Sequence, residues 1–213
     1  MITTVLFDFG GVFTPSPFAA VKAGGAVNGH DPEVLLALVF GPYDRDTDHP
    51  WHQLERGEIS FSDCHRQLRQ LAADQGIDAD PLEALRGMGS GERHDEPFVS
   101  RGLKLRAEGY RTGLITNNIK EFSAGWRSLL PVDDLFEVVI DSCEVGMRKP
   151  NPRIFQLALE KLGDPEPNQT VFIDDYQGNI DAANALGMHG ILVGADRAAA
   201  VDELDALLDR HRR

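Results

Sequence analysis

Residues 3–11 read TTVLFDFGG, an apolar run that ends in a carboxylate, a phenylalanine and two glycines. The run from Thr3 to Phe7 lacks the strict alternation of a strand with one solvated face. It is typical of a strand buried on both faces of a parallel sheet. Ligands of such sheets bind beyond the carboxyl ends of the strands, which is where Asp8 stands. The segment therefore predicts an α/β fold with Asp8 at the functional edge of the sheet.

Four later segments have the same buried-strand character, and helix-length stretches lie between them. From about Arg101 onward this alternation predicts a parallel sheet with right-handed crossovers, and so a three-layer, Rossmann-like α/β core. The four segments are RTGLIT (111–116), FEVVID (136–141), TVFID (170–174) and GILVG (190–194).

The stretch between the first strand and the second has helical periodicity and no convincing strand. Its clearest helix covers Phe61 to Ala73, with Ser60 as the expected N-cap. A helical lobe inserted directly after a strand that ends in a carboxylate suggests a lid over a site. We expect a core made of residues 1–15 and 101–213, and an inserted α-helical cap made of residues 16–100.

Composition excludes several classes of partner. The 213 residues include 34 Asp or Glu and 21 Lys or Arg, a net charge of −13, which disfavours nucleic-acid binding because phosphate backbones recruit basic residues. No apolar run approaches the ~18 residues that span a bilayer, and the N-terminus has no basic region typical of a signal peptide. The two cysteines lie far apart and fit neither a disulfide nor paired metal ligands. These features predict a cytoplasmic protein without a membrane partner and leave the oligomeric state open.

Polar residues capable of chemistry follow three of the predicted strands. Asp8 follows the first, Thr116-Asn117 ends the second, and Asp174-Asp175 ends the fourth. Neighbouring carboxylates repel one another unless a cation or protons compensate, and hard oxygen ligands favour Mg²⁺. Lys149 stands at a helix start and could add positive charge to an anionic centre. The residues alone thus predict a Mg²⁺ site for an anionic, phosphorylated substrate.

Four segments, taken in order, resemble the four motifs of the haloacid dehalogenase superfamily. They are DFGGVFT (8–14), LITNN (114–118), VGMRKPNPRIF (145–155) and VFIDD (171–175). Within that superfamily the chain is most similar to the phosphatase-like N-terminal domain of soluble epoxide hydrolase. The segments that carry this closer resemblance are LERGEIS (54–60), DSCEVGM (141–147) and the region from Asp175 to Met188.

The resemblance implies a role for each residue that would touch the phosphoryl group. Asp8 would be the nucleophile and form an aspartyl-phosphate. Thr116 and the backbone amide of Asn117 would bind the phosphoryl oxygens. Lys149 would offset the charge of the nucleophile and the phosphate together, which suits a reaction that depends on positioning and charge neutralisation.

The resemblance also implies a magnesium site. The second oxygen of Asp8, the carbonyl of Gly10 and the carboxylate of Asp175 would hold Mg²⁺. Asp174 would lie next to the ion and act through water or from behind the direct ligands.

Gly10 departs from the pattern of typical phosphatases in the superfamily, which carry a second Asp two residues after the nucleophile. That Asp protonates the leaving alkoxide, and such assistance contributes about 10²–10⁴-fold. We therefore expect the loss to be largest for alkyl phosphates and smallest for aryl or acyl phosphates. The histidines of the insert are candidates to replace it, although a solvated or core position is the more common role for each: His30, His49, His52, His65 and His94.

The resulting hypothesis is a Mg²⁺-dependent phosphatase, an enzyme acting on a small phosphorylated metabolite. Because of Gly10, one alternative is a catalytically weak member that binds a phosphorylated ligand or a partner. A second alternative is a 2-haloacid dehalogenase-type hydrolase of carbon–halogen bonds. Those enzymes usually carry an Arg shortly after the nucleophile to hold the halide, and residues 9–21 contain none.

Overall fold

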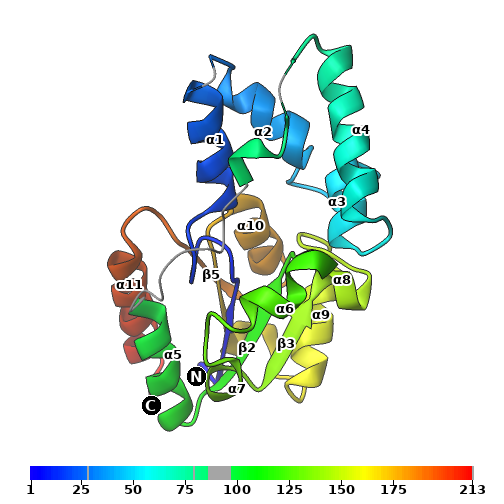
Figure 1. The fold of residues 1–213 in the computed structure, drawn as a ribbon. Helices are drawn as coiled ribbons and strands as arrows, with labels where there is room; N and C mark the ends of the chain where they lie inside the picture. Colours follow the sequence, from blue (N-terminus) through cyan, green and yellow to red (C-terminus); the bar gives the residue numbers. More distant parts are fainter. Residues whose placement is uncertain (28, 79, 86–96, 213) are drawn as a thin grey trace.

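A five-stranded parallel sheet forms the centre of the molecule (Figure 1). The computed structural model describes residues 1–27, 29–78, 80–85 and 97–212. The strand order is β3-β2-β1-β4-β5, and every described pairing is parallel, so the predicted parallel α/β sheet is confirmed. The strands are β1 (Thr4–Phe7), β2 (Arg111–Thr116), β3 (Val138–Asp141), β4 (Thr170–Asp174) and β5 (His189–Leu192).

The register brings the carboxyl ends of three central strands to one edge. Phe7 lies opposite Leu114 of β2 and Ile173 of β4. The amide of Asp8 donates to the carbonyl of Ile173 over 2.8 Å, which fixes the residue directly after β1 against the end of β4. Residues separated by more than a hundred positions therefore meet beside Asp8.

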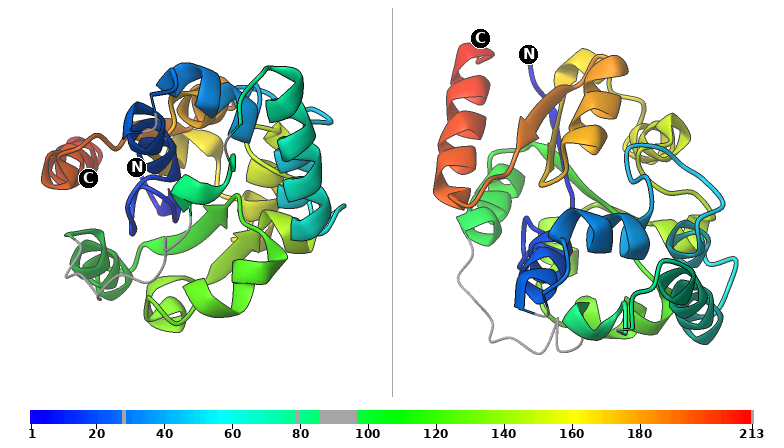
Figure 2. Two further views of the ribbon diagram at one scale, coloured as in Figure 1. Left: turned by 45° about the horizontal axis from the view of Figure 1, so that its top comes forward. Right: turned by 90° about the horizontal axis from the view of Figure 1, so that it is seen from above.

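Helices cover both faces of the sheet, which gives the predicted three layers (Figures 1 and 2). Because successive side chains of a strand point to opposite faces, Val5 and Phe7 join one apolar cluster and Leu6 joins the other. The first face is covered by α5 (Pro97–Ala107), α6 (Ser123–Trp126), α7 (Val132–Leu135) and α11 (Arg197–Arg210). The second is covered by α9 (Pro152–Lys161) and α10 (Gln177–Ala185), while α8 (Ser142–Val145) follows β3.

A helical insert, residues 17–85, follows β1 and lies over the carboxyl edge of the sheet (Figures 1 and 2). The insert has an apolar cluster of its own, separate from the two on the sheet, which includes Leu38, Leu54 and Leu68. Ile119, from the loop after β2, also belongs to this cluster. The insert comprises α1 (Pro17–Val27), α2 (Pro32–Phe40), α3 (Pro50–Glu55), α4 (Phe61–Asp74) and the short η1 (Glu83–Leu85); two more 3₁₀ turns, η2 (Lys120–Phe122) and η3 (Pro167–Gln169), lie elsewhere in the chain.

The N-cap predicted for α4 is confirmed. Ser60 caps α4 as expected, because its hydroxyl accepts from the amide of Asp63 over 3.1 Å. Helix α5 begins at Pro97 and packs on the sheet through Phe98 and Leu105, so the expected boundary at residue 100 falls inside this helix. The division into a core of residues 1–15 and 101–213 and a cap of residues 16–100 stays a prediction. Among the described residues, no helix is both long and apolar enough to cross a bilayer.

Candidate active site

Asp8 lies at the bottom of the site, almost fully buried, beside the ammonium group of Lys149. The distance from Lys149 Nζ to Asp8 Oδ1 is 2.6 Å, and from the same nitrogen to Asp174 Oδ2 it is 2.7 Å. Lys149 is only 1% exposed. One buried cation is therefore shared by two carboxylates that follow from neighbouring strands.

Asn117 holds the Lys149 loop against the end of β2. The amide of Lys149 donates to Asn117 Oδ1 over 2.8 Å, and Asn117 Nδ2 donates back to the carbonyl of Lys149 over 3.0 Å. This reciprocal pair fixes the backbone that carries the ammonium group. Thr116, buried at the end of β2, precedes it directly.

Asp175 completes a cluster of three carboxylates. One oxygen each from Asp8, Asp174 and Asp175 lies within 4.8 Å of the others. Gly11 permits this approach: it has φ +73°, and a Cβ on it would stand 2.1 Å from the carboxyl carbon of Asp175. A larger residue at position 11 would push the Asp175 carboxylate away from the cluster.

The carboxylates of the cluster outnumber the cation beside them. Burial, with the nearby Asp174 and Asp175, raises the pKa of Asp8 well above its usual range despite Lys149. Burial and then Asp174 raise the pKa of Asp175 to about 7. Three oxygen-donor carboxylates against one ammonium are a set that a hard divalent cation fits.

Asp174 differs from the other two because protein donors already occupy both of its oxygens. Oδ2 accepts from Lys149 and from Asn179 Nδ2 over 3.0 Å, and Oδ1 accepts from the amide of Tyr176 over 2.8 Å. Its carboxylate is thus held in a fixed orientation. That arrangement suits a residue that orients Lys149 from behind the direct ligands.

The site opens into a cavity of about 70 Å³ between the sheet and the helical insert. Five of the seven predicted site residues line it, whereas Thr116 and Asp174 lie at the strand ends without lining it. The five are Asp8, Gly10, Asn117, Lys149 and Asp175. A wider hollow of about 560 Å³, lined partly by Met1 and Tyr110, lies where β1 and β2 begin, at the opposite edge from Asp8.

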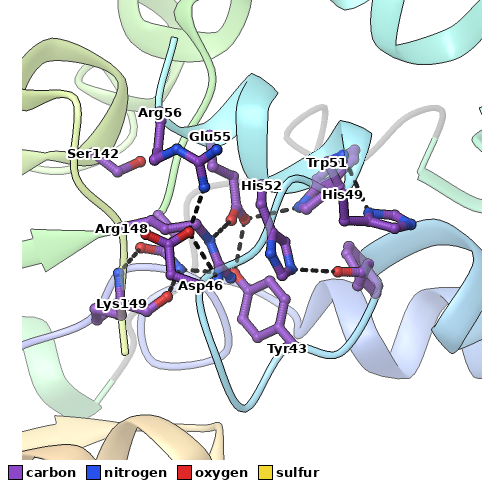
Figure 3. Close-up of polar contacts among 12 residues, drawn as sticks. Tyr43, Asp46, His49, Trp51, His52, Glu55, Arg56, Ser142, Arg148 and Lys149 are labelled. Carbon is purple, nitrogen blue, oxygen red and sulfur yellow. Dashed lines mark hydrogen bonds and ion pairs between the residues drawn. The ribbon is translucent and has the colours of Figure 1, made fainter. Parts of the chain in front are cut away.

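The insert supplies a wall of the cavity that sequence reasoning missed. Phe18, Phe40 and Trp51 contribute rings, and Tyr43 and Glu55 contribute polar groups. Figure 3 shows Glu55 among its partners: Tyr43 Oη donates to Oε1 over 2.7 Å, and Trp51 Nε1 donates to the same oxygen over 2.8 Å.

Glu55 also joins the insert to the core through Arg148. Arg148 Nε donates to Glu55 Oε2 over 2.6 Å, and the guanidinium lies over the Tyr43 ring at 4.4 Å. Both charged groups are buried, with Arg148 fully so. Asn117 Nδ2 reaches Tyr43 Oη over 3.0 Å, so this network is continuous with the Lys149 loop.

The described histidines of the insert do not line the cavity. His52 is fully buried, with Nδ1 accepting from the amide of Thr47 over 3.1 Å and Nε2 next to the Phe40 carbonyl at 2.8 Å. His49 Nδ1 caps α3, and His65 pairs with Asp80 over 2.8 Å. His30 is half-buried and also outside the lining, and His94 lies outside the described residues. No described histidine therefore lines the site to replace the acid absent at Gly10.

We expect His52 to stay neutral far into acid. Burial, and then the charge of Arg148, lowers its pKa to about 3. In the unfolded chain the same imidazole takes up a proton near pH 6.5. The contribution of His52 to the free energy of unfolding is therefore fully present above that pH. It falls as the pH decreases toward 3, by at most about 1.4 kcal/mol per pH unit. Titration of the imidazole by NMR checks this directly; a His52 midpoint near 6 would contradict it.

The sequence of the chain matches the model of a known protein family. The haloacid dehalogenase-like hydrolase model matches residues 2–187. The chain belongs to this family. The resemblance to the haloacid dehalogenase superfamily that the four motifs predict is thus confirmed.

Curated relatives of this hydrolase differ greatly in length. It is 35% identical over 209 residues to acyl-CoA dehydrogenase family member 10 of Mus musculus, covering 96% of this chain and 19% of that protein. It is 34% identical to bifunctional epoxide hydrolase 2 of Sus scrofa, covering 70% of this chain and 29% of that protein. The chain therefore spans less than a third of these two relatives. Sesquiterpene phosphatase astK of Aspergillus oryzae is 29% identical, with 95% of each chain covered.

A solved structure has a similar fold. A haloacid dehalogenase family enzyme of Bacteroides thetaiotaomicron, crystallised with magnesium and inorganic phosphate, matches with a TM-score of 0.59 and 26% identity, covering 92% of this chain and 97% of that one.

Proposed function

We propose that this hydrolase is a Mg²⁺-dependent phosphatase of small phosphorylated metabolites that works through an aspartyl-phosphate. The observation that carries the proposal is the buried Asp8 carboxylate 2.6 Å from Lys149 and within one cluster with Asp174 and Asp175. The phosphatase relative that spans the same length, and the magnesium and phosphate in a structural relative, support it.

In the first step an oxygen of Asp8 attacks phosphorus, and the bond from phosphorus to the leaving oxygen breaks with its electron pair. Lys149 stabilises the charge on Asp8 and on the phosphoryl oxygens. Thr116 and the Asn117 amide would bind those oxygens and so orient the phosphorus toward the Asp8 carboxylate. Water then attacks phosphorus, releasing inorganic phosphate and the free Asp8 carboxylate.

The donor set fits a magnesium ion. Asp8, the Gly10 carbonyl and Asp175 would hold it, and Asp174, already held by Lys149 and Asn179, would lie beside these ligands. When bound, Mg²⁺ supplies positive charge that offsets the carboxylates and the phosphoryl oxygens. Hydrolysis of a carbon–halogen bond would not require that charge, so the carboxylate cluster favours the phosphatase over the dehalogenase alternative.

Gly10 limits the leaving groups that the site can handle. A Cβ built on Gly10 would meet only Pro17, at 3.6 Å, and the position offers no proton donor. Among the described lining residues, Tyr43 carries the only hydroxyl, and it donates to Glu55; burial, and then the charge of Glu55, raises the pKa of Tyr43 well above its usual range. Aryl and acyl phosphates, which leave without a proton, are therefore the expected good substrates.

Phenyl phosphate is the substrate that tests the proposal. We expect phosphate release that requires Mg²⁺, is abolished by a chelator and returns when Mg²⁺ is added in excess. The Asp8→Asn variant sets the background. Release at that background with Mg²⁺ present would instead favour a ligand-binding member without useful turnover, for which phosphate-induced thermal stabilisation is the readout.

The proposed substrates are small soluble metabolites, and a cytoplasmic location stays part of this proposal. The net charge of −13 argues against a nucleic-acid substrate.

A further inference from the structure

The charged groups that line the cavity are unbalanced. Among its described lining residues, Asp8, Glu55 and Asp175 are acidic and Lys149 alone is basic. Lys149 already contacts Asp8 and Asp174, and on that side a bound phosphate and Mg²⁺ would balance the remaining charges. On the Glu55 side, a second anionic group of a substrate would meet a carboxylate with no lining cation to receive it.

Arg148 is the other cation of this region, but it faces Glu55 from behind. Its Nε donates to Glu55 Oε2 over 2.6 Å, and its Nη1 donates to the carbonyl of Arg45 over 3.2 Å. It is fully buried, does not line the cavity, and stacks over the Tyr43 ring. Its Nη2 has no hydrogen-bond partner, and its carboxylate neighbours are Glu55 and, at 4.0 Å from Nη1, Asp46, so the guanidinium is already engaged on the far side of Glu55.

The rest of this wall is apolar. Phe18 packs edge-on against Phe40 and Tyr43, each at 4.9 Å between ring centroids, and Phe40 packs on Trp51 at 5.2 Å. Interlocked rings form a rigid surface that an uncharged group can contact. The indole of Trp51 donates its only N–H to Glu55, so it offers no further hydrogen-bond donor to a substrate.

We infer that Glu55 is a specificity-determining residue. Its carboxylate, held in place by Arg148, Tyr43 and Trp51, excludes phosphates whose leaving group carries a second negative charge and admits those with an uncharged, apolar leaving group. The inference rests on the proposed function, because it assumes that the phosphoryl group lies at Asp8. It adds the chemical class of the group attached to that phosphate.

Two phosphonates of the same shape test the inference without requiring turnover. With Mg²⁺ present, calorimetry gives the Kd of benzylphosphonate and of 4-carboxybenzylphosphonate. We expect the carboxylated compound to bind at least about tenfold more weakly, since like charges placed together in an interface are strongly unfavourable. Equal affinities, or tighter binding of the carboxylated compound, would overturn the inference.

Glu55→Gln assigns the selection to the residue. Glutamine keeps the shape of the side chain and an oxygen that accepts from Tyr43 and Trp51, but it removes the negative charge and leaves Asp46, 4.0 Å away, as the carboxylate beside Arg148. The ratio of the two Kd values should then fall below about threefold. Glu58→Gln is the matched control, because Glu58 pairs with Arg56 and does not line the cavity, and it should keep the wild-type ratio. If Glu55→Gln does not fold, the wild-type comparison still decides.

Phenyl phosphate turnover separates the two proposals. Turnover with equal Kd values contradicts the role of Glu55 and keeps the phosphatase. A tenfold difference without turnover keeps the role of Glu55 and contradicts the phosphatase. If the phosphonates do not bind and phenyl phosphate is not turned over, both proposals are contradicted.

Discussion

Asp8→Asn is expected to lower kcat/KM for phenyl phosphate by at least about 10⁴-fold, as removal of a covalent nucleophile does in other enzymes. Asparagine matches the size of aspartate, but its amide does not attack phosphorus and carries no charge for Lys149. The measurement is phosphate release at saturating Mg²⁺.

Asp78→Asn is the matched control for this substitution. Asp78 is exposed in the insert and is not part of the cavity lining, so the same chemical change there should leave kcat/KM unchanged. Far-UV circular dichroism verifies that both variants fold. An Asp8→Asn enzyme within tenfold of wild type would remove Asp8 from the nucleophile role.

Arg148→Met is expected to destabilise the protein by about 3–5 kcal/mol, because it leaves the Glu55 carboxylate buried without its cation. Tyr43 and Trp51 still donate to Glu55, but neither carries charge. Urea unfolding, with the free energy extrapolated to water, measures the loss.

The control removes the same type of side chain from the surface. Arg66 pairs with Asp63 one turn away on α4, and its side chain is 72% exposed. Arg66→Met should therefore cost no more than about 1 kcal/mol. Equal losses in the two variants would mean that the Glu55–Arg148 pair does not hold the insert to the core.

The strands and the polar residues after them could be predicted because both signals are local. Buried strands have continuous apolar runs, and a carboxylate directly after such a run is visible without knowledge of the fold. The bounds were harder to predict: the strand was expected from Phe136, but β3 begins at Val138 because Phe136 caps the end of α7 and packs in the first apolar cluster. The order and spacing of the motifs were enough to predict that Asp8 and Lys149 belong to one site.

The Glu55–Arg148 pair could not be predicted. Its members are 93 residues apart, and nothing in the sequence distinguishes a buried charge from a solvated one. The position of Arg148 next to Lys149 was the only local signal. For the histidines, the sequence offered candidates that the structure does not place in the site. Backbone groups of Thr47 and Phe40 hydrogen-bond to His52, and the amide of Trp51 hydrogen-bonds to His49, so neither ring faces the cavity.

Ile119 limits how freely the lobe above the site can be exchanged. It follows β2 yet is buried in the apolar cluster of the helical insert, at 2% exposure. A chimaera that grafts this lobe onto another scaffold would open a void where Ile119 packs and would strand Glu55 without Arg148. A working chimaera would therefore have to carry Ile119 and Arg148 of the core together with the helical insert.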